Sequence, residues 1–479
     1  MQLNWDKYPI QKLYDETISS PANARAPSRK LLKYFNSLSE DELKERLIAA
    51  DTAIKTIGIS FTVYSDSGNI DRQWPLDIIP RIISNKEWSK VEQGLVQRLT
   101  ALNCFINDIY NDKKIFKDKL VPLDIILGSP GYRKECEGIT VPYNTWAHVC
   151  GTDLIRDDHG RFLVLEDNLR IPSGVSYMLE NRRVTKRVLP ELFQSYNVKH
   201  LGDYPNQLLD MLKNIAPKNS KQSEVVVLTP GIYNSAYFEH SYLAQQMGAE
   251  LVEGCDLTVE KDYVYMKTVA GLKKVHVIYR RVDDLFLDPE VFDKNSLLGV
   301  RGLMRAWRKG NVSIANCPGA GVADDKVIYS YVPEIIKYYL DEDPLLDNVE
   351  SYLCSVTEQR EYVLQNMHKL VIKPANESGG YGMLIGPQAS ESEINKFKKL
   401  IKKNGRNYIA QPLISLSTCP VITNAGAKPR HIDLRPFILQ SKSTYVTPGG
   451  LTRVAMKQGS YVVNSSQGGG SKDTWVIET

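Results

Sequence analysis

Two carboxylates and one amide stand close together in the segment 151–168. Asp153 and Glu166 flank Asp157-Asp-His-Gly160, whose composition is typical of a tight turn between antiparallel strands. Glu166 and Asn168 are two residues apart and so share a strand face, whereas Asp167 faces the other way and is expected to be structural. Asp153, Glu166 and Asn168 form the hard oxygen set that magnesium prefers, completed by water and phosphates. Taken alone, such a motif more often belongs to a solvated acidic hairpin.

A lysine and a glycine-rich loop form a second candidate site. Lys373 ends the apolar run 370–373, and Gly379, Gly380 and Gly382 follow it. Glycines let backbone N–H groups approach phosphate oxygens closely, and the lysine can reach the same phosphates. The loop differs from a Walker A motif because its lysine precedes the glycines. Lys326, after a Gly-rich stretch, is a second candidate cation. The alternatives are a simple hairpin turn and an exposed lysine.

The C-terminal part alternates short apolar runs with polar residues, which predicts antiparallel strands. Asp433 and Arg435 share a strand face, and Arg453 and Asn464 lie on later candidate strands. Arginine forks onto phosphates and carboxylates, so these side chains suit a phosphoryl group and an attacking carboxylate. Ordinary salt-bridged strands are the alternative.

Helices and strands alternate along the rest of the chain, which predicts an α/β fold in several lobes. Ser39 and Glu42 form a capping box at a helix start, and Asn85 is expected to cap a longer helix. Residues 175–200 are predicted to be helical. The run 225–252 has a βαβ pattern typical of a parallel sheet. A Rossmann-like lobe is therefore expected over 221–345, without a Gly-x-Gly-x-x-Gly fingerprint.

Composition excludes several classes of protein. The net charge is +4 over 479 residues, too small to indicate a nucleic-acid partner. The N-terminus has no apolar leader and no run approaches membrane-spanning length, so we expect no secretion and no membrane partner. Seven dispersed cysteines without a Cys-x-x-Cys pair favour reduced thiols in the cytoplasm. No Ser-His-Asp or Cys-His order is present, and His148 and His431 are interpreted as structural.

The motifs together resemble the ATP-grasp nucleotide site in a rotated order. Ordinary ATP-grasp ligases carry the metal-binding Asp and Glu-x-Asn last, whereas here they come first. That order resembles the circularly permuted ATP-grasp proteins, a bacterial group related to glutathionylspermidine synthase-type enzymes. One departure is Ile171, where the family leads us to expect a hydroxyl residue. Five further sequence motifs resemble those of the same family: Asp77-Ile-Ile-Pro-Arg81, Glu166-Asp-Asn-Leu-Arg-Ile-Pro-Ser-Gly174, Leu179-Glu-Asn-Arg182, Tyr279-Arg-Arg-Val-Asp-Asp284 and Gly321-Val-Ala-Asp-Asp-Lys326.

The resemblance implies five parts of the chain. They are an N-terminal helical region (1–115), a part with the metal ligands (116–215), a Rossmann-like pre-ATP lobe (221–345), an ATP-binding lid (346–415) and the remaining catalytic strands (416–479). The hairpin of Asp153 and Glu166 should then lie in the same sheet as the strands of Asp433 and Arg453.

The resemblance also implies an activity with ATP and Mg²⁺. We expect an ADP-forming carboxylate–amine or carboxylate–thiol ligase that acts on a small acid or peptide through an acyl phosphate. Lys326, Lys373 and the glycine loop would hold the phosphates, and Gln411 and Leu413 would border adenine. Asn464 would also bind ATP. Arg453, supported by Arg435, would stabilise the transition state. A phosphotransferase and a non-catalytic nucleotide-binding partner protein stay open as alternatives. Operon-encoded helical or transglutaminase-like proteins are expected partners.

Overall fold

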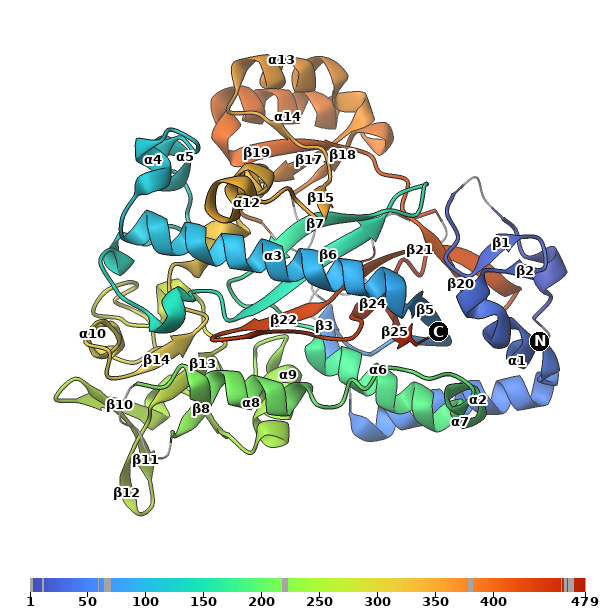
Figure 1. Ribbon diagram of the computed structural model, residues 1–479, viewed down its shortest axis with the longest axis horizontal. Coiled ribbons are helices and arrows are strands. Elements are labelled where there is room, and N and C mark those ends of the chain that lie inside the picture. The colour runs from blue at the N-terminus through green and yellow to red at the C-terminus, as the bar shows by residue number, and fades with distance from the viewer. Residues whose placement is uncertain are drawn as a thin grey trace.

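The computed structural model describes residues 3–10, 13–58, 60–63, 70–217, 223–377, 382–457, 459–460, 463 and 469–478. A ten-stranded sheet forms its centre (Figure 1), with a main path in the order β15-β7-β6-β21-β24-β25-β5 and with β20, β22 and β23 attached. Neighbours from β7 to β25 are antiparallel, whereas β15 and β5 join the two ends in parallel. The strands are β5 (Leu76–Ser84), β6 (Val149–Arg156), β7 (Phe162–Asn168), β15 (Asp347–Asn348), β20 (Thr418–Thr423), β21 (Gly426–Arg435), β22 (Phe437–Gln440), β23 (Thr444–Val446), β24 (Leu451–Val454) and β25 (Gly470–Ile477).

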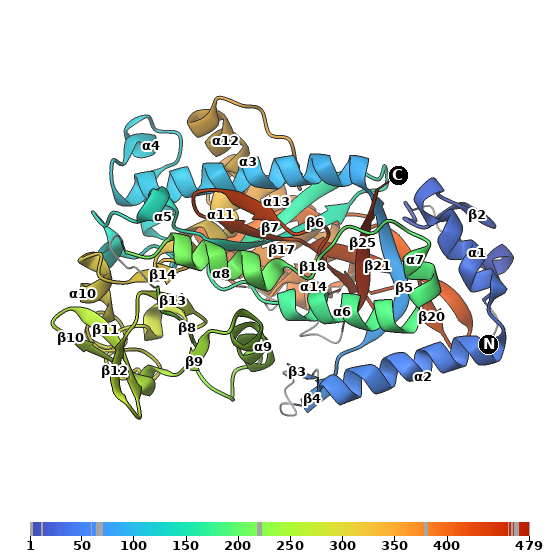
Figure 2. The same ribbon diagram turned by 60° about the horizontal axis from the view of Figure 1, so that its bottom comes forward.

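Helices cover both faces of this sheet, as Figure 2 shows. Helix α3 (Asn85–Tyr110) crosses one face and α6 (Val175–Val188) crosses the other. Alternate residues of β25 supply the two cores, because successive strand side chains point to opposite faces. Val476 packs in the apolar cluster that contains α3, whereas Trp475 and Ile477 pack in the cluster that contains α6.

The predicted strand-turn-strand at Asp153 and Glu166 is confirmed. In the antiparallel pair β6–β7, Asp153 lies opposite Glu166. The turn closes with a hydrogen bond from Gly160 N to Asp157 O (3.0 Å), and Gly160 has a φ of +80°, which glycine adopts without strain. Strands β21 and β24 carry Asp433 and Arg453 in the same sheet. The prediction that these distant segments share one sheet is therefore confirmed.

A separate four-stranded sheet lies above the central one in Figure 1. Its antiparallel order is β16-β19-β17-β18, and α13 and α14 pack on it around their own apolar cluster. Lys373 lies on β17, an inner strand of this sheet. The elements are β16 (Tyr352–Leu353), β17 (Leu370–Pro374), β18 (Leu384–Ile385), β19 (Tyr408–Pro412), α13 (Thr357–Asn366) and α14 (Glu391–Lys403).

The predicted βαβ unit is present in the lower lobe of Figure 1. Strands β8 (Val225–Leu228) and β9 (Glu250–Val252) are parallel and are joined through α9 (Tyr237–Met247). The full order is β14-β13-β8-β9, and β10, β11 and β12 form a small antiparallel sheet beside it. The other elements are α8 (Tyr204–Asn214), β10 (Leu257–Glu260), β11 (Tyr263–Thr268), β12 (Gly271–Lys274), β13 (Val277–Arg280), α10 (Leu303–Arg308) and β14 (Ser313–Ala315).

The N-terminal region contains helices and part of the central sheet. The capping box of Ser39 and Glu42 opens α2 as predicted. The prediction that Asn85 caps α3 is wrong, because Ser84 is the N-cap and forms a capping box with Glu87. Strand β5 lies within the expected helical region and pairs with β25. The other elements are β1 (Ile18–Ser20), β2 (Asn23–Ala24), α1 (Arg29–Ser37), α2 (Glu40–Ile57), β3 (Ser60–Val63) and β4 (Ile70–Gln73).

The helix expected over 175–200 is divided in two. Helix α6 ends at Val188, and Pro190 starts the short helix α7 (Pro190–Gln194), since proline cannot supply an N–H inside a continuing helix. Within the described part of the chain, no helix is long and apolar enough to cross a bilayer. The remaining helices are α4 (Lys114–Lys117), α5 (Leu123–Leu127), α11 (Lys326–Tyr329) and α12 (Val332–Leu340).

Candidate active site

Asp153 lies at the centre of a buried group of charges. Arg435 donates to it twice, from Nε to Oδ1 (2.5 Å) and from Nη2 to Oδ2 (2.8 Å). Arg453 Nη2 donates to Asp153 Oδ2 (2.7 Å), and its Nε donates to Asp433 Oδ1 (2.9 Å). Burial alone would raise the pKa of Asp153, but Arg435 and Arg453 outweigh it and hold the pKa below its usual value. Asp153 is therefore an anion that orients two arginines.

Glu166 and two lysines form the adjoining part of the site. Lys326 Nζ lies 3.3 Å from Glu166 Oε2 and donates to Glu377 O (2.7 Å). Burial lowers the pKa of Lys373 to about 8, although Glu166 acts in the opposite direction. Lys326 also acts on Lys373 in the direction that lowers its pKa. The two predicted phosphate-binding lysines are thus close to the predicted metal ligand Glu166.

Backbone contacts explain why the two lysines converge. Lys326 opens α11, and its N–H donates to Ala375 O (2.9 Å), just beyond the end of β17. Lys373 Nζ donates to Gln411 Oε1 (2.6 Å), and Gln411 Nε2 donates to Ser351 Oγ (2.9 Å). Gln411 thereby positions Lys373 through its buried side chain, a role that the sequence did not indicate.

Gly382 and Leu413 are the other predicted nucleotide contacts that the structure describes. Gly382 has a φ of +67°, and a Cβ there would lie 3.3 Å from Pro374 Cγ. Leu413 directly follows β19 and is half-buried. Their contact with a nucleotide, and that of Gln411, stays a prediction. The predicted residues Gly379, Gly380 and Asn464 lie outside the described residues.

The oxygen donors at the hairpin fit a magnesium ion by chemistry. Asn168 Nδ2 donates to Gly151 O (3.0 Å), which leaves the amide oxygen as the end that can face a cation. Glu166 is partly exposed, whereas both oxygens of Asp153 accept from guanidinium groups. No group of three or more Asp, Glu, His or Cys side chains suited to a metal occurs within the described ranges. Magnesium commonly binds one or two carboxylates together with substrate phosphates, so a bound nucleotide would complete this set.

Asp167 points to the opposite face, as predicted. Arg98 of α3 donates to it from Nε (2.9 Å to each carboxylate oxygen) and from Nη2 (2.6 Å to Oδ2). Arg98 Nη1 also donates to Asn348 Oδ1 of β15 (2.7 Å). This ion pair fixes α3 and two strands together behind the site.

Asn316 holds the end of the hairpin in place. Its Oδ1 accepts from the N–H groups of His148 and Val149 (both 2.7 Å), and its Nδ2 donates to Val149 O (2.7 Å) and Leu169 O (2.5 Å). One buried amide therefore joins the start of β6 to the segment after β7. Asn316 was not predicted from the sequence. The only signal near it was the Gly/Pro-rich stretch that follows, which indicated a loop.

Arg281 and Glu239 clamp the loop that follows Asn168. Arg281 donates from Nη1 to Pro172 O (2.8 Å) and from Nη2 to Ser173 Oγ (2.5 Å). Glu239 Oε2 accepts from Gly174 N (2.8 Å), and its other oxygen pairs with Arg281 (3.3 Å). The segment Tyr279–Asp284 was noted in the sequence without a role, and this clamp supplies one.

Comparison with known proteins agrees with this geometry. A family model described as "Circularly permuted ATP-grasp type 2" matches residues 80–455. The chain belongs to the circularly permuted ATP-grasp type 2 family. Membership implies ATP binding, and it agrees with the rotated order in which the hairpin of β6 and β7 precedes the lysines.

Relatives and one solved structure extend this comparison. An uncharacterized protein of Synechocystis sp. is 54% identical over 479 residues, which are 100% of this chain and 99% of that protein. One of Mycobacterium tuberculosis is 48% identical over 465 residues, 97% of this chain and 84% of that protein. A Frankia alni protein named "Putative glutamate--cysteine ligase 2-3" is 40% identical over 468 residues, and the match covers 97% of this chain but 54% of that longer protein. A glutathione synthetase-like effector from Globodera pallida, solved in apo form, has a TM-score of 0.60 at 12% identity, covering 92% of this chain and 98% of that one. At that identity the likeness concerns the fold alone.

Proposed function

We propose that the protein is an ADP-forming ligase that uses ATP to activate the carboxylate of a small acid or peptide and joins it to an amine or thiol. The observation that carries this proposal is the meeting of two kinds of cation beside Glu166. Lys326 lies 3.3 Å from Glu166, and Arg435 Nη2 lies 4.0 Å from the other oxygen of the same side chain. The lysines suit the phosphates of ATP, and the arginines suit the group to which phosphate is transferred.

In the first step, phosphate transfer to the substrate carboxylate, different residues would bind ATP and stabilise the transition state. Lys326 and Lys373 would bind the α- and β-phosphates. A substrate carboxylate oxygen would attack the γ-phosphorus while the bond to the ADP oxygen breaks, which gives an acyl phosphate and ADP. Arg453 and Arg435, preorganised by Asp153 and Asp433, would face the negative charge that develops. Glu166 and Asn168, with Asp153, would hold Mg²⁺, which neutralises phosphate charge when bound.

In the second step, an amine would attack the acyl carbon and phosphate would leave. The proton lost by the amine would pass to the departing phosphate, so this step needs no covalent enzyme intermediate. The absence of a recognisable nucleophile motif in the sequence is consistent with such chemistry.

The test is an assay of the purified chain with ATP, Mg²⁺ and a broad panel of acids and amines. We expect ADP and phosphate to form together with an amide or thioester, and ¹⁸O from a labelled carboxylate to appear in the phosphate. Release of AMP and pyrophosphate would rule out the acyl-phosphate route. A stable phosphorylated acid without an amide would identify a phosphotransferase instead.

Substitutions of single lysines test whether ATP binds at this site. Lys326→Met and Lys373→Met should each weaken ATP binding by at least about tenfold, because each removes a phosphate-binding charge. Lys399→Met, at an exposed position of α14, should leave ATP binding unchanged. Equal effects of all three substitutions would contradict the assignment of the lysines.

A further inference from the structure

A pocket of about 550 Å³ lies where α6 packs against α7 and α9. This volume is within the range of small-molecule sites. The lining comes from α6, α7, the loop 198–202, the start of α8 and α9. Asp153, Asp433 and Arg453, the buried charges of the candidate active site, do not line it. The pocket is therefore a separate feature of the molecule, and we call it the α6 pocket.

Glu180 of α6 is the acidic residue of this pocket. Its side chain is 1% exposed, and Oε2 accepts no hydrogen bond within the described structure. The other oxygen, Oε1, lies 3.5 Å from Arg183 Nη1, but the side chain of Arg183 is 72% exposed, so solvent weakens this pair. Tyr242 also lines the pocket, and burial together with the charge of Glu180 raises the pKa of its phenol, which stays neutral. The carboxylate charge is therefore buried without a cation of the protein that fully compensates it.

The other charged side chains of the α6 pocket are basic. Arg182 is already paired with Asp473, to whose Oδ2 its Nε donates (2.9 Å). Lys186 Nζ lies 5.6 Å from the centre of the Phe193 ring, and neither Lys186 nor Lys199 forms an ion pair with any residue that the structure describes. The pocket thus surrounds one buried carboxylate with positive charge. The basic lining residues are Arg182, Arg183, Lys186, Lys199 and His200.

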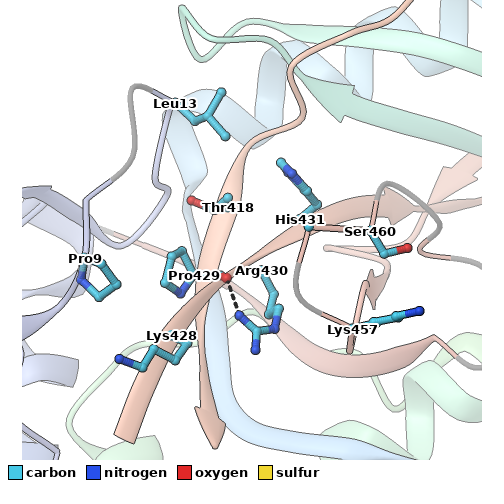
Figure 3. A pocket seen from close by; sticks show the side chains of 10 residues that line it. Pro9, Leu13, Thr418, Lys428, Pro429, Arg430, His431, Lys457 and Ser460 are labelled. Atoms are coloured by element: carbon cyan, nitrogen blue, oxygen red, sulfur yellow. Dashed lines mark hydrogen bonds between the residues drawn. The ribbon is translucent and has the colours of Figure 1, made fainter. Parts of the chain in front are cut away.

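The pocket drawn in Figure 3 has a different charge pattern. It is smaller, about 310 Å³, and its lining contains Lys428, Arg430 and Lys457 but no aspartate or glutamate. Cations alone attract anions of any kind, so that lining does not select one class of ligand. The α6 pocket is more selective, because it combines both signs of charge.

This combination of charges disfavours simple ions as ligands of the α6 pocket. A plain anion such as phosphate would be repelled by the buried carboxylate of Glu180, and a plain amine would be repelled by the basic side chains. A zwitterion avoids both conflicts, because its ammonium group can donate to Glu180 Oε2 while its carboxylate accepts from a guanidinium group. In an α-amino acid the two charged groups are attached to one carbon, and Glu180 and Arg183 are correspondingly close.

Apolar side chains complete the lining of the α6 pocket. Leu179, Leu201 and Pro205 are buried, and Phe193 and Val198 are half-buried. An apolar group that packs against them is removed from water, which favours binding. The lining therefore suits an amino acid whose side chain is large and apolar.

We propose that the α6 pocket binds an α-amino acid with a large apolar side chain. Its ammonium group is held by Glu180 Oε2, and its carboxylate is held by Arg183 and Lys186, which are one turn apart on α6. None of the residues assigned above to ATP, magnesium or phosphoryl transfer lines this pocket. The site is therefore additional to the proposed ligase function and does not depend on it.

Isothermal titration calorimetry of the full-length protein with L-phenylalanine tests the site. Two analogues each lack one charge, since phenethylamine has no carboxylate and 3-phenylpropionate has no ammonium group. We expect L-phenylalanine to bind, and each analogue to bind at least about tenfold more weakly, because a charged hydrogen bond is lost. The same analogues separate a zwitterion site from a site for amines or for acids.

Substitutions place the binding in the α6 pocket. Glu180→Gln and Arg183→Gln should each weaken L-phenylalanine binding at least about tenfold, because each removes one of the two charges that the ligand meets. Arg187→Gln is the matched control, since Arg187 is exposed on the same helix but does not line the pocket. Lys457→Ala, in the pocket of Figure 3, is a second control. Both control variants should bind as the wild type does.

The possible outcomes are distinct. Absence of L-phenylalanine binding, or binding that Glu180→Gln and Arg183→Gln leave unchanged, would overturn the site. Equal affinity for L-phenylalanine and for either analogue would overturn the zwitterion assignment. If Glu180→Gln fails to fold, Arg183→Gln provides the same comparison at an exposed position. L-phenylalanine binding that depends on Glu180 in a protein that joins no acid to an amine or thiol would support this site and count against the ligase function alone.

Discussion

Asp153 accepts hydrogen bonds from Arg435 and Arg453, which lie 282 and 300 residues further along the chain. Its carboxylate is buried and ionised, and each of its oxygens has a guanidinium partner. Removing the charge would leave both arginines without the anion that orients them. Asp153 therefore contributes to stability and to the geometry of the site at once.

Asp153→Asn should abolish turnover and lower the free energy of unfolding by roughly 3 kcal/mol, the usual effect of breaking a buried ion pair. Urea denaturation and the ADP-release assay would measure the two effects. Asp158→Asn, an exposed neighbour on the turn after β6, should change stability by less than about 0.5 kcal/mol. Equal stability of the two variants would contradict the buried-pair interpretation.

Lys373 provides a prediction on pH. Burial lowers its pKa to about 8, so the side chain is charged below pH 8 and loses its charge as the pH rises. ATP affinity should therefore fall by about tenfold between pH 7 and pH 9, since only the protonated lysine pairs with phosphate. Titration of an ATP analogue at several pH values would measure this fall. In Lys373→Arg the fall should largely disappear, because guanidinium stays charged; persistence of the full effect there would assign it to another group.

The junction of β5 and α3 determines where the long helix begins. Ser84 Oγ accepts from Glu87 N (3.3 Å), and Glu87 Oε2 accepts from Ser84 N (3.4 Å) and Oγ (2.9 Å). Asn85 Oδ1 is buried and accepts no hydrogen bond within the described structure. The helix that covers one face of the sheet thus starts from the last residue of a strand.

Ser84→Ala should lower the free energy of unfolding by about 1 kcal/mol, because it removes the N-cap. Asn85→Ala should leave stability unchanged or slightly higher, since the buried oxygen of Asn85 makes no such bond. Thermal unfolding of both variants would measure the difference. If Asn85→Ala lowered the free energy of unfolding more than Ser84→Ala did, Asn85 and not Ser84 would be the N-cap.

A buried ion pair and the hydrogen bonds around it join the N-terminal segment to strands near the other end of the chain. Arg81 of β5 donates from Nη2 to Glu16 Oε1 (2.6 Å) and from Nη1 to Asp433 O (3.1 Å). Ser417 Oγ also donates to Glu16 (2.6 Å). Burial acts to raise the pKa of Glu16, but Arg81 and Arg156 outweigh it and lower that pKa. The N-terminal segment is thereby held against β21, the strand that carries Asp433 and Arg435.

Glu16→Gln should lower the free energy of unfolding by roughly 3 kcal/mol at pH 7. Because the pKa of Glu16 is lower in the folded state, its contribution is present above the unfolded value of about 4.3 and is lost as the pH falls. The gap between wild type and variant should therefore narrow below about pH 4.3. Urea unfolding across this pH range would measure it, with Glu361→Gln, exposed on α13, as the control. A gap independent of pH would show that charge is not the cause.

Local patterns in the sequence were enough to predict the hairpin, the strand faces and the types of side chain in the site. Turn composition placed the hairpin of Asp153 and Glu166, strand alternation separated Asp167 from its neighbours, and the order of the motifs indicated the rotated family. The hairpin and the strand faces depend on residues within one strand-turn-strand unit, where backbone geometry limits the arrangements, whereas the order of the motifs can be seen directly in the sequence.

The contacts between distant groups follow from the tertiary structure and were not predicted. The structure showed that Asp153 is held by Arg435 and Arg453, that Gln411 positions Lys373, and that Asn316, Arg281 and Glu239 secure the hairpin. Such contacts depend on sheet order and on packing between segments that are 38 to 300 residues apart, so no local pattern encodes them.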